Sequence, residues 1–140
     1  DNEVLLQKKA RGFGAGKWNA PGGKNEKGES NDESVKREVL EETNLIIINP
    51  ESLGYIEFIY DDPQWNTRFF LFYVDQYRGE ERDMGEGELK WYNIDQLPFE
   101  NMWEDDSYFL EKLLKTKIVK NQRFYFNNDY KIIKHEYIKI

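Results

Sequence analysis

The sequence predicts an α+β fold, an α/β/α sandwich in which helices flank a mixed β-sheet. Segments rich in aromatic and β-branched residues occur before, between and after two stretches with helical periodicity. The chain has 140 residues and no cysteine, so its core must be stable without disulfides. It contains no run approaching the ~20 apolar residues of a membrane helix. We therefore expect a single domain covering residues 1–140.

Two helices are expected, over residues 33–43 and 107–116. The first contains no Gly or Pro, and the second can be capped by Asp106 with its apolar residues facing inward. A Gly-rich loop over residues 10–17 follows the first strand, and the two asparagines at 127 and 128 form the turn of a terminal hairpin. The expected strands are Val4–Lys9, Leu45–Ile48, Leu53–Tyr60, Thr67–Tyr77, Glu88–Asn93, Gln122–Phe126 and Tyr130–Ile140. Trp65 and the aromatic residues of the Thr67–Tyr77 segment are expected in the core or on a strand face.

The ends of the first helix can be read from local chemistry. Ser30, Asn31 and Asp32 are all competent N-cap residues. Asn44 can end the helix in a left-handed conformation. Val35 and Val39, four residues apart, form an apolar stripe that would dock on a core.

Three carboxylates lie on one face of this helix. Glu38 is three residues from Glu41 and four from Glu42, so their side chains project from neighbouring positions. Like charges at this spacing repel, and a hard divalent cation such as Mg2+ offsets that repulsion. For an arbitrary acidic helix a solvated face is the commoner explanation. Arg37, four residues before Glu41, and the Pro-Gly-Gly turn at residues 21–23, whose backbone can approach a ligand closely, favour a site instead.

The segment from Gly23 to Leu45 reads Gly-x5-Glu-x7-Arg-Glu-apolar-x-Glu-Glu-x-Asn-apolar. At average residue frequencies, a chance match to its six fixed positions arises at roughly one start site in ten million. The segment resembles the Nudix box of the Nudix hydrolases, with Asn44 in place of the usual glycine. Asparagine is the next-best residue for that backbone position, so the departure is compatible with the motif.

The resemblance extends to one branch of the family, the MutT homologues that hydrolyse oxidised purine nucleoside triphosphates. It is carried by GFGAGKWNAPGGK at residues 12–24 and LPFENMWEDDSYF at residues 97–109, and we expect it to run from about Val4 to Tyr137. It implies that Mg2+, or Mn2+, is held by Glu38, Glu42, Glu86 and the Gly22 carbonyl, with Glu41 binding or polarising the attacking water. Arg37 would then orient Glu41. Ala20-Pro21 stands where the mammalian relatives have Gly-Phe. The proline ring at this position stiffens the turn.

The same resemblance implies a set of substrate-binding residues. Asn19 and the pair Asp105–Asp106 would hydrogen-bond the purine edge, and Trp103 would stack on the base. The remaining members of the set are Phe13, Phe58, Tyr60, Lys9 at the pocket edge, and Gly23. Without the resemblance, Trp103 would be taken for a core aromatic and the two aspartates for helix caps. Adjacent carboxylates nevertheless suit base recognition, because each raises the other's pKa and one can stay protonated.

The charge distribution limits the choice of partners. Residues 1–106 carry 12 Lys and Arg against 24 Asp and Glu, whereas residues 107–140 carry 8 against 3. An acidic body is poorly suited to duplex nucleic acid. We expect a small nucleotide substrate, no membrane partner, a monomer and a cytoplasmic location. The lone histidine, His135, is given no catalytic role.

Two other functions remain open on the sequence. One is a Nudix hydrolase acting on another nucleoside diphosphate derivative, such as ADP-ribose, a dinucleoside polyphosphate or a capped RNA end. The other is a non-enzymatic nucleotide-binding module, which usually loses the box glutamates that this chain retains. Nudix proteins also normally carry a full strand before the one at Val4. We therefore expect that first family strand, which would help to wall the pocket, to be missing from this chain.

Overall fold

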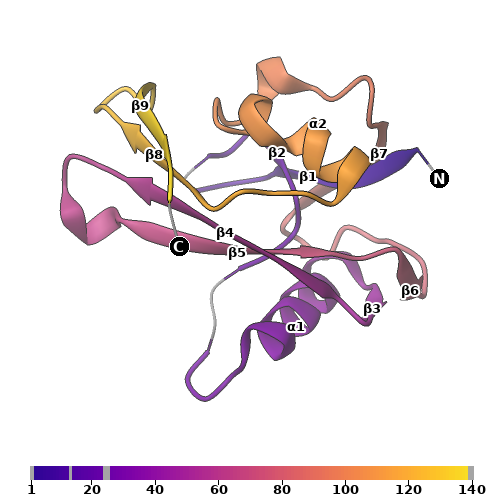
Figure 1. The fold of residues 1–140 in the computed structure, drawn as a ribbon. Helices are drawn as coiled ribbons and strands as arrows, with labels where there is room; N and C mark the ends of the chain where they lie inside the picture. The colour runs from indigo at the N-terminus through magenta and orange to yellow at the C-terminus, as the bar shows by residue number, and fades with distance from the viewer. Residues whose placement is uncertain (1, 13, 24–25, 139–140) are drawn as a thin grey trace. The chain divides into compact units, whose positions relative to one another are not determined.

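The computed structural model describes residues 2–12, 14–23 and 26–138. The chain forms two compact units. Figure 1 labels the helices and strands of both. The first unit comprises Asp1–Pro50 and Val74–Trp103, and the second comprises Glu51–Tyr73 and Glu104–Ile140. The expectation of a single domain stays a prediction.

The described residues of the first unit form two antiparallel sheets and one α-helix. A three-stranded sheet has the order β2-β1-β7, and a two-stranded sheet pairs β3 with β6. The elements are β1 (Glu3–Lys9), β2 (Trp18–Asn19), α1 (Asn31–Thr43), β3 (Ile46–Ile48), β6 (Gln76–Arg78) and β7 (Gly87–Asn93). A short helical turn, η2 (Phe99–Asn101), follows β7. The expected strands at Val4, Leu45 and Glu88 are therefore confirmed.

Up to residue 138, the second unit is a four-stranded sheet with one α-helix. The strand order is β5-β4-β8-β9, in which β4 and β8 run parallel and the other pairs run antiparallel. The elements are β4 (Glu51–Ile59), η1 (Pro63–Trp65), β5 (Thr67–Tyr73), α2 (Asp106–Thr116), β8 (Gln122–Phe126) and β9 (Ile132–Tyr137). Phe109 and Leu113 of α2 pack with Ile56, Phe124 and Phe126 of the sheet to form the core of this unit. The predicted mixed sheet and the inward face of the second helix are confirmed.

Helix α1 begins and ends as its sequence predicts. Ser30 is the N-cap and forms a capping box with Glu33, so that each side chain satisfies the backbone N–H of the other. Asn44 ends the helix in the left-handed region, with φ of 68°. Val39 is buried against Leu45 and Ile47. These contacts fix the rotation of α1 about its axis and hence the direction of its carboxylates.

The start of α2 differs from the expectation. The helix begins at Asp106, and Asp105 occupies the cap position without a side-chain cap hydrogen bond. The Ser107 hydroxyl instead donates to the Glu104 carbonyl at 2.9 Å. The prediction that Asp106 caps the helix was therefore wrong. Both aspartates are buried, which removes them from the solvated position that a capping side chain usually occupies.

The aromatic segment predicted as one strand from Thr67 to Tyr77 is two strands. β5 ends at Tyr73 and pairs with β4, whereas β6 pairs with β3 in the first unit. Two of its phenylalanines, Phe69 and Phe70, are 46% exposed and Trp65 is 63% exposed, so these three side chains lie outside the core. β5 is an edge strand, which leaves its outer side chains with few neighbours.

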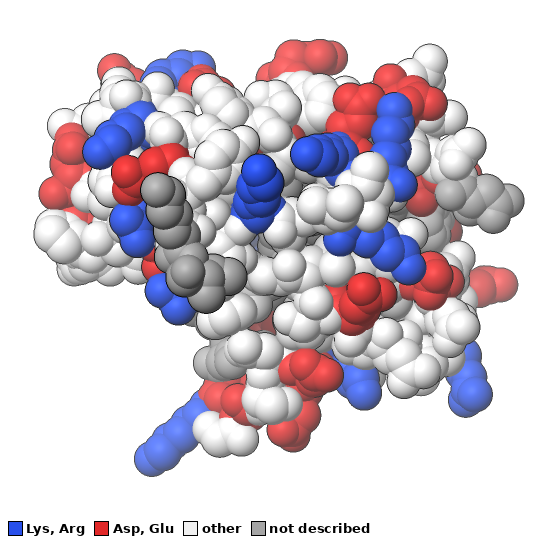
Figure 2. All heavy atoms as spheres, in the orientation of Figure 1, with Lys and Arg blue, Asp and Glu red and all other residues white. Residues whose placement is uncertain are grey.

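Acidic and basic side chains are interspersed on the face shown in Figure 2. No helix within residues 2–12, 14–23 and 26–138 has both the length and the apolar character needed to cross a membrane.

Thr43 joins the end of α1 to the rest of the first unit. Its side chain is fully buried. The Thr43 hydroxyl donates to the Val39 carbonyl at 2.7 Å and accepts from the Leu45 N–H at 3.2 Å. Thr116 makes the same two bonds at the end of α2, to Lys112 and from Ile118, but in an exposed position.

Thr43→Val should lower the free energy of unfolding by about 1–3 kcal/mol, because it leaves the buried Leu45 N–H without an acceptor. Thr116→Val is the matched control and should cost less than Thr43→Val, since water replaces the lost bond at the exposed site. Urea unfolding of both variants measures the difference. Equal losses for the two would show that burial at Thr43 carries no penalty.

Candidate active site

Three carboxylates, Glu38, Glu41 and Glu86, act on the half-buried side chain of Glu42 in the first unit. Burial is the largest cause that raises the pKa of Glu42, to about 7, and the negative charges of Glu38, Glu86 and Glu41 raise it further. One contact opposes this shift, because the Gly22 N–H donates to Glu42 Oε2 at 3.2 Å. The expected crowding of Glu38, Glu41 and Glu42 on one face of α1 therefore contributes to the raised pKa of Glu42.

Arg37 provides the positive charge at this face. Its guanidinium donates to both oxygens of Glu29, from Nε at 2.6 Å and from NH2 at 3.0 Å. Its NH1 lies 3.1 Å from Glu41 Oε2 and 2.9 Å from Glu38 Oε1. The Arg37 guanidinium is also the largest cause that lowers the pKa of Glu29. One guanidinium thus fixes three carboxylates, including the contact to Glu41 that the spacing suggested.

The glycine at position 23 lies against the acidic face. A Cβ atom placed on Gly23 would overlap the carboxylate of Glu38, whereas one on Gly22 would meet nothing within 4 Å. Gly23 therefore allows the turn to approach α1 closely enough for the Gly22 N–H to reach Glu42. Any larger residue at position 23 must displace the Glu38 side chain.

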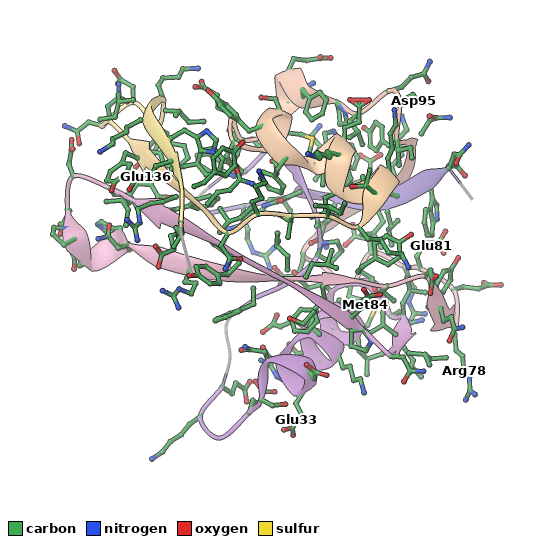
Figure 3. The ribbon with its side chains drawn as sticks, viewed as in Figure 1. Glu33, Arg78, Glu81, Met84, Asp95 and Glu136 are labelled. Atoms are coloured by element: carbon green, nitrogen blue, oxygen red, sulfur yellow. The ribbon has the colours of Figure 1, made fainter. Side chains whose placement is uncertain are left out.

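Glu86 reaches the site on a loop that is fastened at several points. The Thr43 carbonyl accepts from Arg82 N–H at 2.9 Å, which ties the loop to the end of α1. The Glu86 carbonyl accepts from Ala10 N–H at 3.0 Å, which ties it to the end of β1. Asp83 Oδ1 accepts from the N–H groups of Gly85 and Gly87 at 2.8 and 3.3 Å. Arg78, Glu81 and Met84 mark the course of this segment in Figure 3.

Asp83 was not singled out from the sequence. The signal for it is the Asp-x-Gly-x-Gly pattern at residues 83–87, since aspartate side chains commonly bond backbone N–H groups two residues on. Glu26 was also missed. Its carboxylate lies 3.4 Å from Arg37 NH1, and its N–H donates to Glu29 Oε1 at 2.6 Å, which completes the support of Glu29.

The oxygen donors of this face fit a hard divalent cation in type. Carboxylates and a backbone carbonyl are the ligands that Mg2+ and Mn2+ take in proteins. Burial is the largest cause of the raised pKa of Glu42, and the neighbouring negative charges add to it; a cation would offset the latter contribution. As the side chains stand, Glu38 contacts Arg37 and Glu42 accepts from Gly22. Within the described ranges, no three acidic or histidine side chains are arranged as a ready metal cage.

Three of the expected substrate-binding residues lie in the first unit outside the acidic face. Trp103 is partly exposed, and a Cβ on Gly14 would come within 3.1 Å of its ring. The ammonium of Lys17 lies 5.4 Å from the centre of the Trp103 ring. Trp103 therefore stands against the Gly-rich loop rather than in a core. Asn19 and Lys9 are exposed at the ends of β2 and β1, and Phe13 lies outside the described residues.

The other four expected substrate-binding residues, Phe58, Tyr60, Asp105 and Asp106, lie in the second unit. Phe58 and Tyr60 are partly buried and pack against its core, Tyr60 stacking on Phe126 with ring centres 5.4 Å apart. Burial raises the pKa of Tyr60 to about 12, with a further contribution from the charge of Asp105.

Asp105 is a buried acid with an unsatisfied oxygen. It is 2% exposed, and none of the described residues donates to its Oδ1 atom. Burial raises its pKa to about 7, and the charge of Glu104 adds to that shift. A carboxyl with this pKa can accept or donate a hydrogen bond near neutral pH. Asp105 makes no side-chain cap hydrogen bond, so a capping role does not explain its burial.

The titration of Asp105 should appear in the stability of the protein. Because the folded chain holds this proton more tightly than the unfolded chain, the free energy of unfolding should fall as pH rises from 4 through about 7. Asp105→Asn should reduce that dependence and leave the part that comes from Glu42, and the exposed Asp61→Asn should leave it unchanged. Denaturant unfolding at pH 5 and pH 8 tests this. A wild-type slope retained in Asp105→Asn would contradict it.

Comparison with known proteins places the chain in a family. A model of the NUDIX domain matches residues 1–113. An oxidized purine nucleoside triphosphate hydrolase of Mus musculus is 39% identical over 114 residues, which cover 81% of this chain and 73% of the mouse protein. YvcI of Bacillus subtilis, an uncharacterized Nudix hydrolase, is 33% identical over 141 residues, covering 96% of this chain and 85% of YvcI. The match to the mouse protein is thus shorter than the near-complete one expected from the sequence.

The fold agrees with that assignment. The crystal structure of a MutT protein from Bacillus halodurans matches with a TM-score of 0.84 at 31% identity, covering 96% of this chain and 89% of that one. Members of the family generally use a divalent metal ion and act on small nucleotide substrates. The chain therefore belongs to the Nudix hydrolase family, and its mixed sheet with two helices is the Nudix fold.

Proposed function

We propose that this protein hydrolyses oxidised purine nucleoside triphosphates of the 8-oxo-dGTP type to the nucleoside monophosphate and pyrophosphate. The observation that carries the proposal is the group of four carboxylates made up of Glu42 and its neighbours Glu38, Glu41 and Glu86. Arg37 supports this group, and the Gly22–Gly23 turn approaches it. The similarity to the mouse oxidized purine nucleoside triphosphate hydrolase supports the choice of substrate. In this role the protein would act as a cytoplasmic monomer that removes oxidised purines from the nucleotide pool.

Each residue of the acidic face has a separate role in this proposal. Glu38, Glu42, Glu86 and the Gly22 carbonyl would hold Mg2+, with Mn2+ as a substitute. The ion supplies charge neutralisation, which allows a triphosphate to approach a strongly acidic face. Glu41 takes the proton of the attacking water, and Arg37 positions Glu41 through the contact at 3.1 Å. Glu29 and Glu26 hold Arg37 from its other side.

Recognition of the base is assigned to residues with exposed rings or unsatisfied polar atoms. Trp103 offers a partly exposed ring for stacking, and Asn19 offers an exposed amide, whose Oδ1 also accepts from Ala20 N–H at 3.0 Å. Asp105 offers a carboxyl with a pKa of about 7, which can match either a donor or an acceptor on a purine edge. The proposed substrate-binding set is completed by Lys9, Phe13, Gly23, Phe58, Tyr60 and Asp106.

Glu42→Gln tests the metal assignment. It should lower turnover with Mg2+ by orders of magnitude and abolish the rise in melting temperature that Mg2+ produces in the wild type. Without metal the variant should melt at the same temperature as the wild type or slightly above it, because a repelling charge is lost. Glu88→Gln, an exposed change on β7, is the control. Near-normal turnover of Glu42→Gln at saturating Mg2+ would remove Glu42 from the ligand set.

A nucleotide panel tests the substrate. Wild-type protein with Mg2+ should release pyrophosphate from 8-oxo-dGTP faster than from dGTP, and EDTA should abolish release. Trp103→Ala should cost about 1–3 kcal/mol in the free energy of base binding. Asp105→Asn should change the ratio of kcat/KM for 8-oxo-dGTP over dGTP while leaving the Mg2+ requirement unchanged.

Different results would point to the alternatives. Faster turnover of ADP-ribose or a dinucleoside polyphosphate would keep the Nudix chemistry and replace the substrate. Tight binding of nucleotides with no hydrolysis across the panel would favour a binding module. An unchanged kcat/KM ratio in Asp105→Asn would take Asp105 out of base recognition.

A further inference from the structure

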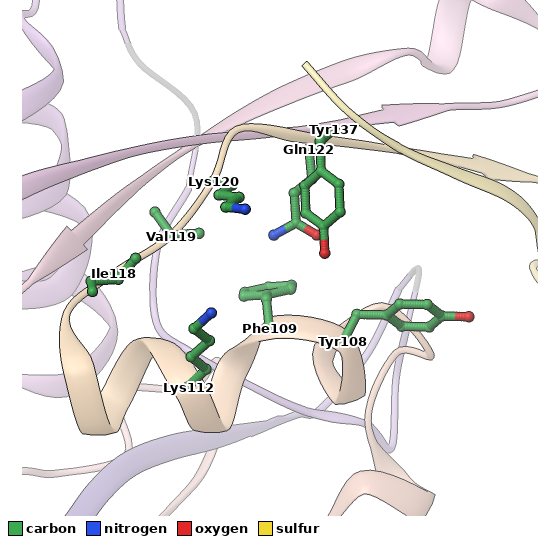
Figure 4. A pocket seen from close by; sticks show the side chains of 8 residues that line it. All are labelled: Tyr108, Phe109, Lys112, Ile118, Val119, Lys120, Gln122 and Tyr137. Atoms are coloured by element: carbon green, nitrogen blue, oxygen red, sulfur yellow. The ribbon is translucent and has the colours of Figure 1, made fainter. Parts of the chain in front are cut away.

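The second unit contains a cavity of about 60 Å3 that is formed by α2, the segment after it and the strands β8 and β9 (Figure 4). A single water needs about 10–15 Å3 on this scale, so the cavity has room for a few waters or for one phosphate-sized group. Its lining residues are Tyr108, Phe109, Lys112, Ile118, Val119, Lys120, Gln122 and Tyr137. Five of the eight follow residue 113, where the match to the family model ends.

Two lysines at the cavity differ from the other basic residues of this unit. Neither Lys112 nor Lys120 forms an ion pair with a carboxylate in the described part of the chain. By contrast, Lys115 pairs with Glu111 at 3.0 Å. Further pairs are Lys117–Glu51, Lys131–Glu104, Lys134–Glu136 and Arg123 with Glu57 and Glu136. In Figure 4 the amino groups of Lys112 and Lys120 point toward the cavity from opposite sides.

A buried amide adds a third donor. Gln122 is 3% exposed, and its Oε1 lies 2.7 Å from His135 Nε2. An amide oxygen can only accept, so His135 must carry its proton on Nε2 and donate it. The Gln122 Nε2 group then remains available, because no hydrogen bond within the described residues uses it. His135 stacks on Phe124 with ring centres 4.5 Å apart, which fixes the donor that orients Gln122.

The other residues that line the cavity are aliphatic or aromatic, and the tyrosines among them also carry a hydroxyl group. Phe109 is buried and forms one wall, and the Tyr137 hydroxyl points into the space in Figure 4. No carboxylate is among the lining residues. The Lys120 ammonium lies 5.3 Å from the Tyr137 ring, a contact that limits where the lysine side chain extends. The polar groups that converge here are two ammonium groups, an amide N–H and a hydroxyl, and together they suit an anion.

We propose that this cavity is a binding site for a phosphate-class oxyanion, either inorganic phosphate or one phosphoryl end of pyrophosphate. Lys112 and Lys120 would supply the charge, and Gln122 would supply a directed hydrogen bond from a buried position. The site belongs to the second unit alone, whereas the acidic face of α1 belongs to the first. The proposal does not depend on the substrate proposed above.

The test is a titration of the 15N-labelled full chain in EDTA, at an ionic strength held constant with sodium chloride. Inorganic phosphate is added in one arm and pyrophosphate in the other. The side-chain NH2 resonances of Gln122 should shift and saturate in at least one arm, and the arm that saturates at lower concentration identifies the ligand. Lys112→Gln and Lys120→Gln should each weaken binding about tenfold, as expected for loss of one charged hydrogen-bond partner.

Lys115→Gln is the matched control. It removes the same charge from the same helix at a residue that pairs with Glu111 and does not line the cavity, so binding should stay as in the wild type. Glu42→Gln should also bind as the wild type does, which separates this site from the acidic face. No saturable shift in either arm, or equal weakening by Lys115→Gln and Lys120→Gln, would overturn the proposal.

Discussion

Repulsion among the carboxylates on and beside α1 is the constraint on which the first unit depends. Burial is the largest cause that raises the pKa of Glu42, and the charges of Glu38, Glu86 and Glu41 raise it further; without support such a group would spread apart or bind protons. Arg37 holds two of these carboxylates, and its bidentate contact with Glu29 keeps the guanidinium in place. Contacts at the two ends of α1 also stabilise this arrangement of charges. The capping box at Ser30 and the buried hydroxyl of Thr43 fix the two ends of the helix that carries the charges.

The features of α1 that depend on neighbours in sequence could be predicted, because helix caps and side-chain spacing are local. The left-handed Asn44, the buried Val39 and the proximity of Arg37 to Glu41 all belong to this class. The position of Glu86 could not be derived in this way. Its loop is held by two backbone hydrogen bonds. The Arg82 N–H donates to the carbonyl of Thr43, 39 residues earlier in the chain, and the Ala10 N–H donates to the Glu86 carbonyl. Such pairings depend on the tertiary fold, and only the resemblance to a family pointed to Glu86.

The predictions that were wrong show the same difference between features set by sequence neighbours and features set by the tertiary fold. Asp105 and Asp106 have the composition of a helix cap, and local chemistry favours that role. Burial overrides it, since a carboxyl removed from water gains little from a single backbone N–H and its pKa rises instead. The segment from Thr67 to Tyr77 reads as continuous strand because its residues have high β-propensity throughout. Its division follows from pairing, as β5 lies beside β4 and β6 lies beside β3.

Charge in the second unit illustrates why composition alone is a weak guide to binding. The excess of basic residues after position 106 is visible in the sequence, yet several of these residues are neutralised by carboxylates from β4, α2 and β9. Exposed pairs of this kind contribute about 0–1 kcal/mol to stability, but they do cancel local charge. What distinguishes Lys112 and Lys120 is that neither pairs with a carboxylate among the described residues and that both line a cavity with a buried amide. A concave arrangement of donors concentrates potential in a way that the same number of paired lysines on a flat surface does not.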